Sequence, residues 1–297
     1  DFSAAQAFAE NETVATDLYL IDRMSLGNLI VDLGIRYSSV DSRDAANDQQ
    51  DEEFPITAGA LYKTSIGLNP YISYAESFRA TVGTDALAGT PLLPRRGEQI
   101  EVGVKYQPPG GSTYISLAYY DLEENNLVDF VTTGQTQPGL TIEAEGIEIE
   151  ALVRVGDLTF DFDFQHQDAQ EVDATGVGLP RPSLPETTAS LWTMWEPSNE
   201  TLDGFRLGAG IRYASENESN GTAFLAANNF APTPFRIVTD GYTVVDALLG
   251  YEFRNGITAA LNVRNLFDEE YFATCLSRGD CFPGEQRTIV GTIGFRF

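Results

Sequence analysis

The two apolar stretches that end the chain, Ile257-Thr-Ala-Ala-Leu-Asn-Val-Arg264 and Ile289-Val-Gly-Thr-Ile-Gly-Phe-Arg-Phe297, decide its fold class. Apolar residues or glycine hold the odd positions of both stretches, and small or polar residues hold most of the even positions. Side chains of a β-strand alternate between its two faces, so each stretch predicts a strand with one apolar wall and one mixed wall. Whether that apolar wall packs in a protein core or contacts lipid is the question that the rest of the sequence answers.

The same alternation recurs upstream, most strictly in Ile100-Glu-Val-Gly-Val-Lys-Tyr106. These three stretches and ten further segments of the chain predict thirteen strands in all. The other expected strands are 14–23, 29–37, 56–62, 70–78, 114–122, 147–153, 158–164, 189–195, 205–213 and 242–253.

The connections between these strands are alternately short and long. Short turns contain residues typical of hairpins, such as Gly27-Asn28, Gly156-Asp157 and Asn255-Gly256. The long loops are 41–53, 79–97, 123–140, 168–186 and 215–240. A soluble sandwich has mixed turn lengths, whereas an outer-membrane barrel has tight periplasmic turns, long extracellular loops and a polar lumen. We therefore predict an all-β, antiparallel transmembrane β-barrel in the bacterial outer membrane, with the apolar wall against lipid.

Composition excludes several other classes. The 297 residues include 18 Lys and Arg and 44 Asp and Glu, so the formal net charge is −26. This charge disfavours nucleic acid as a partner, because phosphate binding needs a basic face. No apolar run approaches the roughly 20 residues of a membrane helix. His166 is the single histidine, so the sequence offers almost no residues for a histidine-based catalytic site or metal site. We expect no enzyme activity, no catalytic residues, no metal site and no cofactor.

The hairpin order also predicts an orientation. If the strand that ends at Phe297 runs toward the periplasm, all the long loops are extracellular and the tight turns periplasmic. Aromatic residues near strand ends would then form the two interfacial girdles. The expected girdle residues are Tyr37, Phe78, Tyr106, Trp192, Trp195, Tyr213, Tyr251, Phe253, Phe295 and Phe297.

The two cysteines of the chain, Cys275 and Cys281, lie in the last long connection, close to Gly279 and Asp280. Their spacing, with no histidine nearby, matches no common zinc site. A disulfide that closes a short loop in an oxidising compartment is one interpretation, and two unpaired thiols are the other.

Several segments resemble the TonB-dependent siderophore receptors, specifically their ferrichrome-type branch. The C-terminal segment from Asn262 to Tyr271, with Asn265-Leu-Phe-Asp268, is followed by the cysteine pair and by Gly284-Glu-Gln-Arg287. Tyr74-Ala-Glu-Ser-Phe78, the stretch 97–108 and Glu145-Gly-Ile-Glu-Ile-Glu150 show the same likeness. Together these segments extend over nearly the whole chain.

The resemblance implies a 22-stranded outer-membrane barrel, filled by an N-terminal plug, that imports a ferric siderophore with energy delivered by TonB. Thirteen strands are too few for that barrel, and no plug segment is recognisable. We therefore expect residues 1–297 to be the C-terminal portion of a receptor barrel, with the plug and the TonB-contacting part absent.

Candidate ligand-binding residues come from the loops. In ferrichrome-type relatives an aromatic residue near the cysteine loop contacts the ligand, but Leu276 follows Cys275 here. Phe272 and Phe282 are the nearest substitutes, with loop packing as their alternative role. Arg95, Arg96 and Arg278 are loop cations that can pair with an anionic chelate or, alternatively, with neighbouring acidic residues.

Other readings of the sequence stay open. A smaller, self-contained passive channel would show the same strand pattern, as would a TonB-dependent receptor for a vitamin, heme, nickel-chelate or glycan. A barrel enzyme or adhesin is a third class, although no nucleophile with a base is visible. Outer-membrane lipid is an expected partner under each of these readings.

Overall fold

The computed structural model describes residues 12–43, 48–131, 134–224, 231–277 and 279–295. Every regular element in these ranges is a β-strand, and none of the ranges contains a helix that could cross a membrane.

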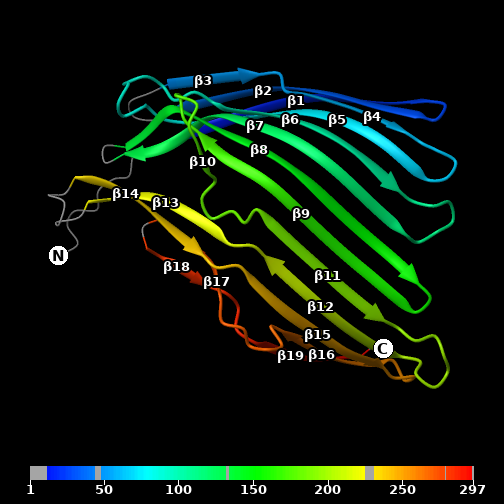
Figure 1. Cartoon of the computed structure of the whole chain (residues 1–297). Helices are drawn as coiled ribbons and strands as arrows, with labels where there is room; N and C mark the ends of the chain where they lie inside the picture. Colours follow the sequence, from blue (N-terminus) through cyan, green and yellow to red (C-terminus); the bar gives the residue numbers. More distant parts are fainter. Residues whose placement is uncertain (1–11, 44–47, 132–133, 225–230, 278, 296–297) are drawn as a thin grey trace.

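One antiparallel sheet of 15 strands makes up most of the described structure (Figure 1). Its continuous path has thirteen strands, as predicted, because β3 (Asp48–Glu53) and β10 (Gly178–Pro180) pair only with the sides of β2 and β9. The path runs through β1 (Glu12–Leu26), β2 (Leu29–Arg43), β4 (Ile56–Tyr62), β5 (Leu68–Arg79), β6 (Arg95–Tyr106), β7 (Tyr114–Val131), β8 (Gly134–Val155), β9 (Leu158–Val172), β11 (Thr187–Trp195), β12 (Phe205–Ala214), β15 (Tyr242–Glu252), β16 (Ile257–Arg264) and β19 (Thr288–Phe295).

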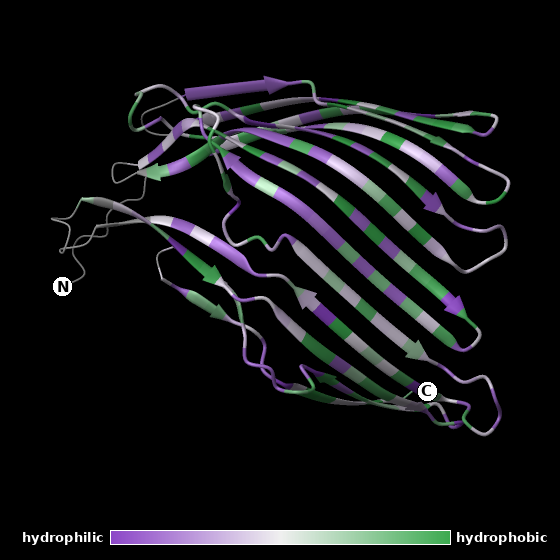
Figure 2. Cartoon of the chain, viewed as in Figure 1, coloured by the Kyte–Doolittle hydropathy of each residue, from purple (hydrophilic) through white to green (hydrophobic). Residues whose placement is uncertain are grey.

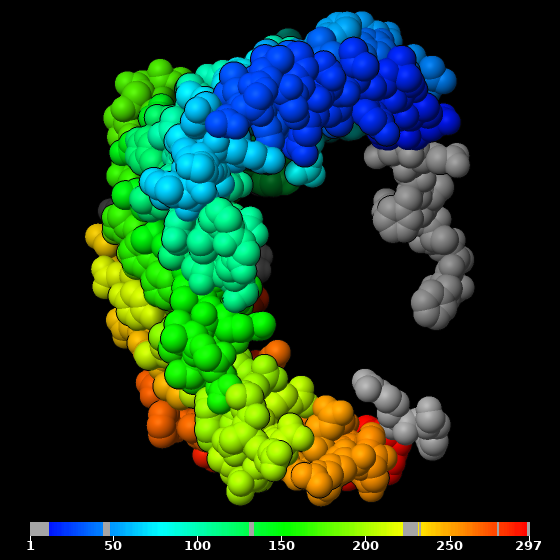
Figure 3. Space-filling view, turned by 90° about the vertical axis from the view of Figure 1, so that its right-hand side faces the viewer, coloured from blue at the N-terminus to red at the C-terminus, as the bar shows by residue number. Residues whose placement is uncertain are grey.

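The sheet curves into an open C, which Figure 3 shows from the side of the tight turns. Its first and last strands, β1 and β19, form the two edges and do not pair with each other within the described residues. The structure is therefore the wall of an unclosed barrel.

The long connections, which we expect to be extracellular, contain more strand than the sequence predicts. The segment 123–140, expected to be a loop, continues β7 and β8 as a tall hairpin with Val131 opposite Gly134. The segment 215–240 contains the hairpin of β13 (Asn217–Phe224) and β14 (Pro232–Thr239), and the segment 41–53 contains β3. Pairing satisfies the backbone N–H and C=O groups of these segments. The buried face of the β13–β14 hairpin is itself polar, with Asn217 6% and Ser219 1% exposed, so its sequence lacks the alternation that reveals a membrane strand.

The strand register places apolar side chains on one face of the whole sheet. Leu33 lies opposite Ala58, Ala58 opposite Tyr74, and Tyr74 opposite Ile100. The stripes of polar and apolar residues are visible along the strands in Figure 2. In this single-layered wall Leu33 is 45%, Val102 43%, Leu261 43% and Ile293 68% exposed, which agrees with the apolar outer band of a transmembrane barrel. We call this the outer face, and the opposite, polar face the inner face.

Tyrosines end the outer apolar band on its extracellular side. The hydroxyls of Tyr37, Tyr74 and Tyr119 donate hydrogen bonds to Glu52 (2.8 Å), Glu76 (2.7 Å) and Glu145 (2.6 Å). Their rings lie at the apolar side and their hydroxyls at the wet side, as expected of an interfacial girdle.

Trp192 does not belong to either girdle, so that part of the prediction was wrong. It lies opposite Asp161 and Gly210 on the inner face, whereas Trp195 lies opposite Leu158 and Leu207 on the outer face. Two strand residues three positions apart must face opposite sides. A methyl group built on Gly208 or Gly210 would come within 2.4 Å of the Trp192 ring, so the indole lies directly against the backbone of β12.

Candidate ligand-binding wall

Five charged residues lie on or beside the upper part of the inner face, on β5, β6, β7 and β9 and just after β10. Arg79 and Arg95 are register partners, and Arg95 lies on the same face as Gly97 and Gln99, opposite to Ile100. Glu124 is the register partner of Gly97, and Glu171 lies on the inner face of β9. Arg181, which follows β10, pairs with Glu171. We call Arg79, Arg95, Glu124, Glu171 and Arg181 the inner upper wall.

Ion pairs hold most of the inner upper wall. A terminal nitrogen of Arg95 lies 2.6 Å from Glu124, and Arg181 pairs with Glu171. The Nε of Arg95 is buried without a hydrogen-bond partner among the described residues. Burial, and then the nearby charge of Arg95, lower the pKa of Arg181. An anionic group of a ligand would find two arginines in this place, already oriented by carboxylates.

Asp85 joins the loop between β5 and β6 to the β7–β8 hairpin. Its carboxylate accepts hydrogen bonds from the N–H groups of Leu87 and Ala88 (2.8 Å each), the Thr136 hydroxyl (3.0 Å) and the Gln137 N–H (2.7 Å). These backbone donors hold the pKa of Asp85 below its usual value, at about 2. Asp85 is only 6% exposed, so the contact is a buried anchor of the extracellular cap.

Glutamine side chains extend that anchor to further loops. The Gln137 amide accepts from the Leu93 N–H (2.6 Å) and donates to the carbonyls of Leu93 (2.7 Å) and Asn126 (2.9 Å). The Gln49 amide on β3 donates to the Leu92 carbonyl at 2.8 Å. Three extracellular connections thus form one hydrogen-bonded cap above the inner upper wall.

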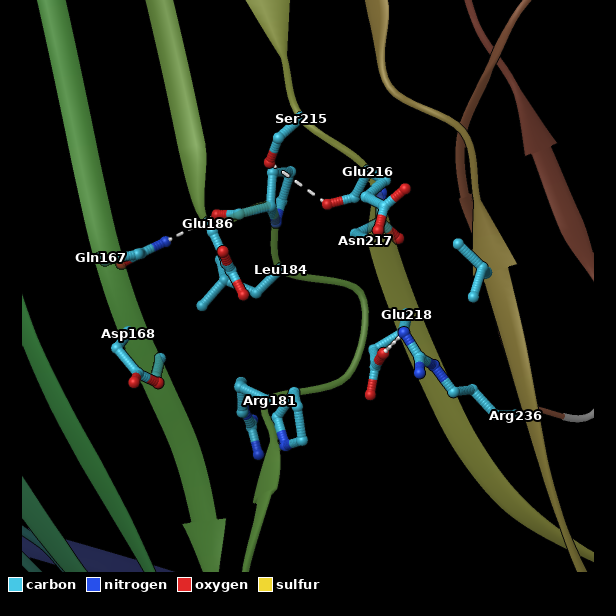
Figure 4. A pocket seen from close by; sticks show the side chains of 14 residues that line it. Gln167, Asp168, Arg181, Leu184, Glu186, Ser215, Glu216, Asn217, Glu218 and Arg236 are labelled. Carbon is cyan, nitrogen blue, oxygen red and sulfur yellow. Dashed lines mark hydrogen bonds and ion pairs between the residues drawn. The ribbon is translucent and has the colours of Figure 1, made fainter.

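A pocket of about 140 Å³ opens beside this wall, where the segment between β10 and β11 lies between β9 and β13 (Figure 4). Its lining includes Arg181 and Arg236, the latter paired with Glu218. Asp168, Glu186 and Glu216 also line it. The pocket therefore offers both hydrogen-bond donors and hydrogen-bond acceptors to a ligand.

The cysteine loop forms a small hairpin of β17 (Phe272–Cys275) and β18 (Cys281–Pro283). The disulfide Cys275–Cys281 closes it, with an S–S distance of 2.04 Å. The Asn217 amide donates to the Ala273 carbonyl (3.1 Å) and accepts from the Thr274 hydroxyl (3.0 Å). The Cys275 N–H donates to the Thr239 hydroxyl at 2.9 Å. The loop is therefore fixed to the β13–β14 hairpin as well as closed on itself.

The Asn265-Leu-Phe-Asp268 motif has a structural role below that loop. Asn265 is 1% exposed with φ 48°, and its amide donates to the carbonyls of Glu269 (2.8 Å) and Glu285 (3.0 Å). Its side-chain oxygen accepts from the Glu269 N–H at 2.8 Å. Asp268 in turn accepts from the Arg287 N–H at 2.9 Å. The motif thus connects the chain after β16 to the chain before β19.

The predicted site residues occupy three separate places. Arg95 lies in the inner upper wall, whereas Arg96, its neighbour in sequence, lies on the outer face and pairs with Glu53. Phe272 (50% exposed) and Phe282 (46% exposed) belong to the cysteine hairpin, and Arg278 lies outside the described residues. Sequence reasoning missed Arg79, Glu124, Glu171 and Arg181. The alternation of faces along β5 would have placed Arg79 on the inner face. Arg181 lies in an irregular segment after β10, where no sequence pattern predicts the direction of its side chain.

Comparison with known proteins defines the class of this protein. Residues 2–266 match the family model described as "TonB dependent receptor-like, beta-barrel". The chain therefore belongs to the TonB-dependent receptor β-barrel family, a family of outer-membrane receptors and transporters rather than enzymes.

Siderophore receptors are among the curated proteins with a similar sequence. The chain is 33% identical to the ferrioxamine B receptor of Salmonella typhimurium over 95% of its own length and 40% of that protein. It is 32% identical to the ferrichrome outer membrane transporter/phage receptor of Escherichia coli K12, over 97% of its own length and 39% of that protein. The chain thus spans about two fifths of the length of these relatives.

Solved structures show the same fold. The ferripyoverdine receptor of Pseudomonas aeruginosa superposes with a TM-score of 0.86 at 19% identity, over 99% of this chain and 40% of that receptor. The ferric-catecholate import receptor Fiu of Escherichia coli K12 superposes with a TM-score of 0.75 at 23% identity, over 96% of this chain and 45% of that receptor.

Proposed function

We propose that the protein imports a ferric siderophore across the outer membrane, with energy supplied through TonB. One observation carries the proposal. The sheet belongs to the TonB-dependent receptor family, and its polar inner face is lined by ion pairs and covered by loops that hydrogen-bond to one another. We further propose that this chain forms the C-terminal portion of the barrel wall. This would explain why the sheet is open and why the chain spans about two fifths of the length of its relatives.

Uptake by cells tests this function. A strain that lacks the full-length gene, grown under iron starvation, should lose uptake of at least one radiolabelled ferric siderophore. Plasmid-borne full-length protein should restore it, and dissipation of the proton gradient should abolish it again. Unchanged uptake of hydroxamate, catecholate and mixed chelates in the deleted strain would refute the proposal.

Arg95 and Arg96 offer a matched test of the ligand site. They are adjacent on β6 but face opposite sides of the wall, so one substitution alters the proposed site and the other does not. We expect Arg95→Gln in the full-length receptor to weaken chelate binding about tenfold, or about 1.4 kcal/mol, and Arg96→Gln to leave it unchanged. Equal effects of the two substitutions would remove the inner upper wall from the site.

Phe272 and Phe282 remain candidate contacts at the cysteine hairpin. Because both are about half exposed at an extracellular position, their rings can pack against an apolar part of a chelate. The roles of ferric siderophore and TonB as partners, and the absence of catalysis, are part of the same proposal.

A further inference from the structure

Two arginines lie directly opposite each other in the inner upper wall. Arg79 ends β5 and Arg95 begins β6, and the strand register makes them partners on the inner face. In an antiparallel sheet the Cβ atoms of directly opposite residues are roughly 5 Å apart, and like charges in such a pair are destabilising. The two guanidinium groups therefore need an anion beside them.

The described residues supply one carboxylate to this pair of arginines. A terminal nitrogen of Arg95 lies 2.6 Å from a carboxylate oxygen of Glu124, but the Nε of Arg95 is buried without a hydrogen-bond partner. Arg79 is exposed and forms no ion pair or side-chain hydrogen bond with another described residue. One positive charge of the pair thus stays unneutralised, although the formal net charge of the chain is −26.

Small residues leave space next to the two arginines. The adjacent register partners on the same face are Ser77 and Gly97. The Ser77 hydroxyl lies close over Gly97, because a methyl group built on Gly97 would come within 2.7 Å of it. A ligand can therefore approach both guanidinium groups from the inner side of the wall without displacing a long side chain at these two positions.

We propose that the imported ferric chelate carries a carboxylate outside its iron-binding groups, and that Arg79 and Arg95 bind this carboxylate together. The inference rests on the proposed import function and names the class of its cargo. A carboxylate has two oxygens that can accept hydrogen bonds from two guanidinium groups, and Glu124 already orients that of Arg95. The bound carboxylate supplies the anion that this pair of arginines lacks.

The charge of the two arginines selects among chelates. A chelate that ends in an ammonium group is repelled by the unneutralised positive charge, and a neutral chelate leaves the repulsion between the arginines in place. A carboxylate offsets that repulsion and accepts charge-assisted hydrogen bonds. The site therefore discriminates by charge, even among chelates with the same iron-binding groups.

Two derivatives of ferrioxamine B test the inference. Acetylation of its terminal amine gives a neutral chelate and succinylation gives a chelate that ends in a carboxylate, whereas the iron(III) trihydroxamate centre is the same in both. We expect the full-length receptor in detergent to bind the succinylated derivative about tenfold more tightly than the acetylated one, as measured by isothermal titration calorimetry.

Variants of the two exposed arginines assign this preference to the inner face. Arg79→Gln should reduce the preference to about twofold or less, through weaker binding of the succinylated derivative. Arg79→Lys keeps the positive charge and should retain most of the preference, and Arg96→Gln, on the outer face, should retain all of it. Heat-modifiable migration on a gel verifies that each variant is folded.

The outcomes separate this inference from the import function. Equal affinity for the two derivatives, or an unchanged preference in Arg79→Gln, would overturn the inference and leave the import of a ferric chelate standing. If neither derivative binds, uptake by cells decides. Import of neutral or cationic chelates alone overturns the inference, and import of a carboxylate-bearing chelate that Arg79→Gln reduces supports it. The absence of uptake for every ferric chelate would refute the import function itself, and the inference with it.

Discussion

Asp85 gathers backbone donors from two loops, so its removal should loosen both of them. In Asp85→Ala of the full-length protein, we expect faster amide exchange over 83–93 and 134–137, because the Leu87, Ala88 and Gln137 N–H groups lose their acceptor. Asp173→Ala is the matched control, since Asp173 accepts from Thr175 and Val177 within its own turn. An effect of Asp85→Ala confined to 85–88 would contradict the role of Asp85 as a link between loops.

The low pKa of Asp85 also predicts how the cap responds to acid. A carboxyl whose pKa is depressed on folding stabilises the folded state above its ordinary pKa, and this contribution is lost as the pH falls through the folded value. For Asp85 that loss should occur between roughly pH 4 and pH 2. The protection of amides over 83–93, meaning their exchange relative to the intrinsic rate at each pH, should fall across this range in the unmodified protein and stay flat in Asp85→Ala.

Asn265 should be among the most sensitive positions of the β16–β19 region. Replacement by alanine removes three side-chain hydrogen bonds from a buried site and leaves a non-glycine residue without an amide at φ 48°. We expect a loss of about 1–3 kcal/mol in stability, read as a lower melting temperature of the full-length protein in detergent. Asn262→Ala, at a half-buried position on β16, should change it little.

At the scale of elements, the pair of β11 and β12 depends on glycine. Trp192 occupies the space that a side chain at Gly210 would need, so Gly210→Ala should displace the indole and destabilise the protein by about 1–3 kcal/mol. Gly250→Ala on β15 is the control, because a methyl group there meets Arg206 no closer than 3.4 Å. Melting temperature together with tryptophan fluorescence measures both effects. A shift in melting temperature without a change in emission would mean that Trp192 stays in place.

The sequence predicted those elements that have one face in lipid. Along Ile100–Tyr106, a face in lipid requires an apolar residue at every second position, and this alternation can be recognised in the sequence. Lipid does not act on the β13–β14 hairpin, whose buried face carries Asn217 and Ser219 rather than apolar residues, so the sequence predicted a loop there. The inner upper wall was predicted only at Arg95, because the approach of Arg181 depends on an irregular segment with no periodic pattern.

At the scale of the whole molecule, the two unpaired edges limit what the chain can do alone. The strands β1 and β19 present backbone N–H and C=O groups that neither lipid nor another described strand satisfies. We expect residues 1–297 expressed alone to aggregate, as sedimentation velocity in detergent would show. The full-length protein, prepared in the same way, is the control. A heat-resistant monomer that inserts into liposomes would show that these edges find partners within the chain.

The height of the outer apolar band has a consequence for the surrounding bilayer. On β12 the outward residues run from Phe205 to Tyr213, which is roughly 26 Å along a strand and, at a tilt of about 40°, roughly 20 Å across the membrane. An average hydrocarbon core of about 30 Å is thicker than this band, and the bacterial outer membrane is itself thinner than that average. When the apolar band is shorter than the hydrocarbon core, the bilayer thins locally around the protein. We therefore expect the protein to be accommodated better by bilayers of short-chain lipids than by thick bilayers rich in sterol.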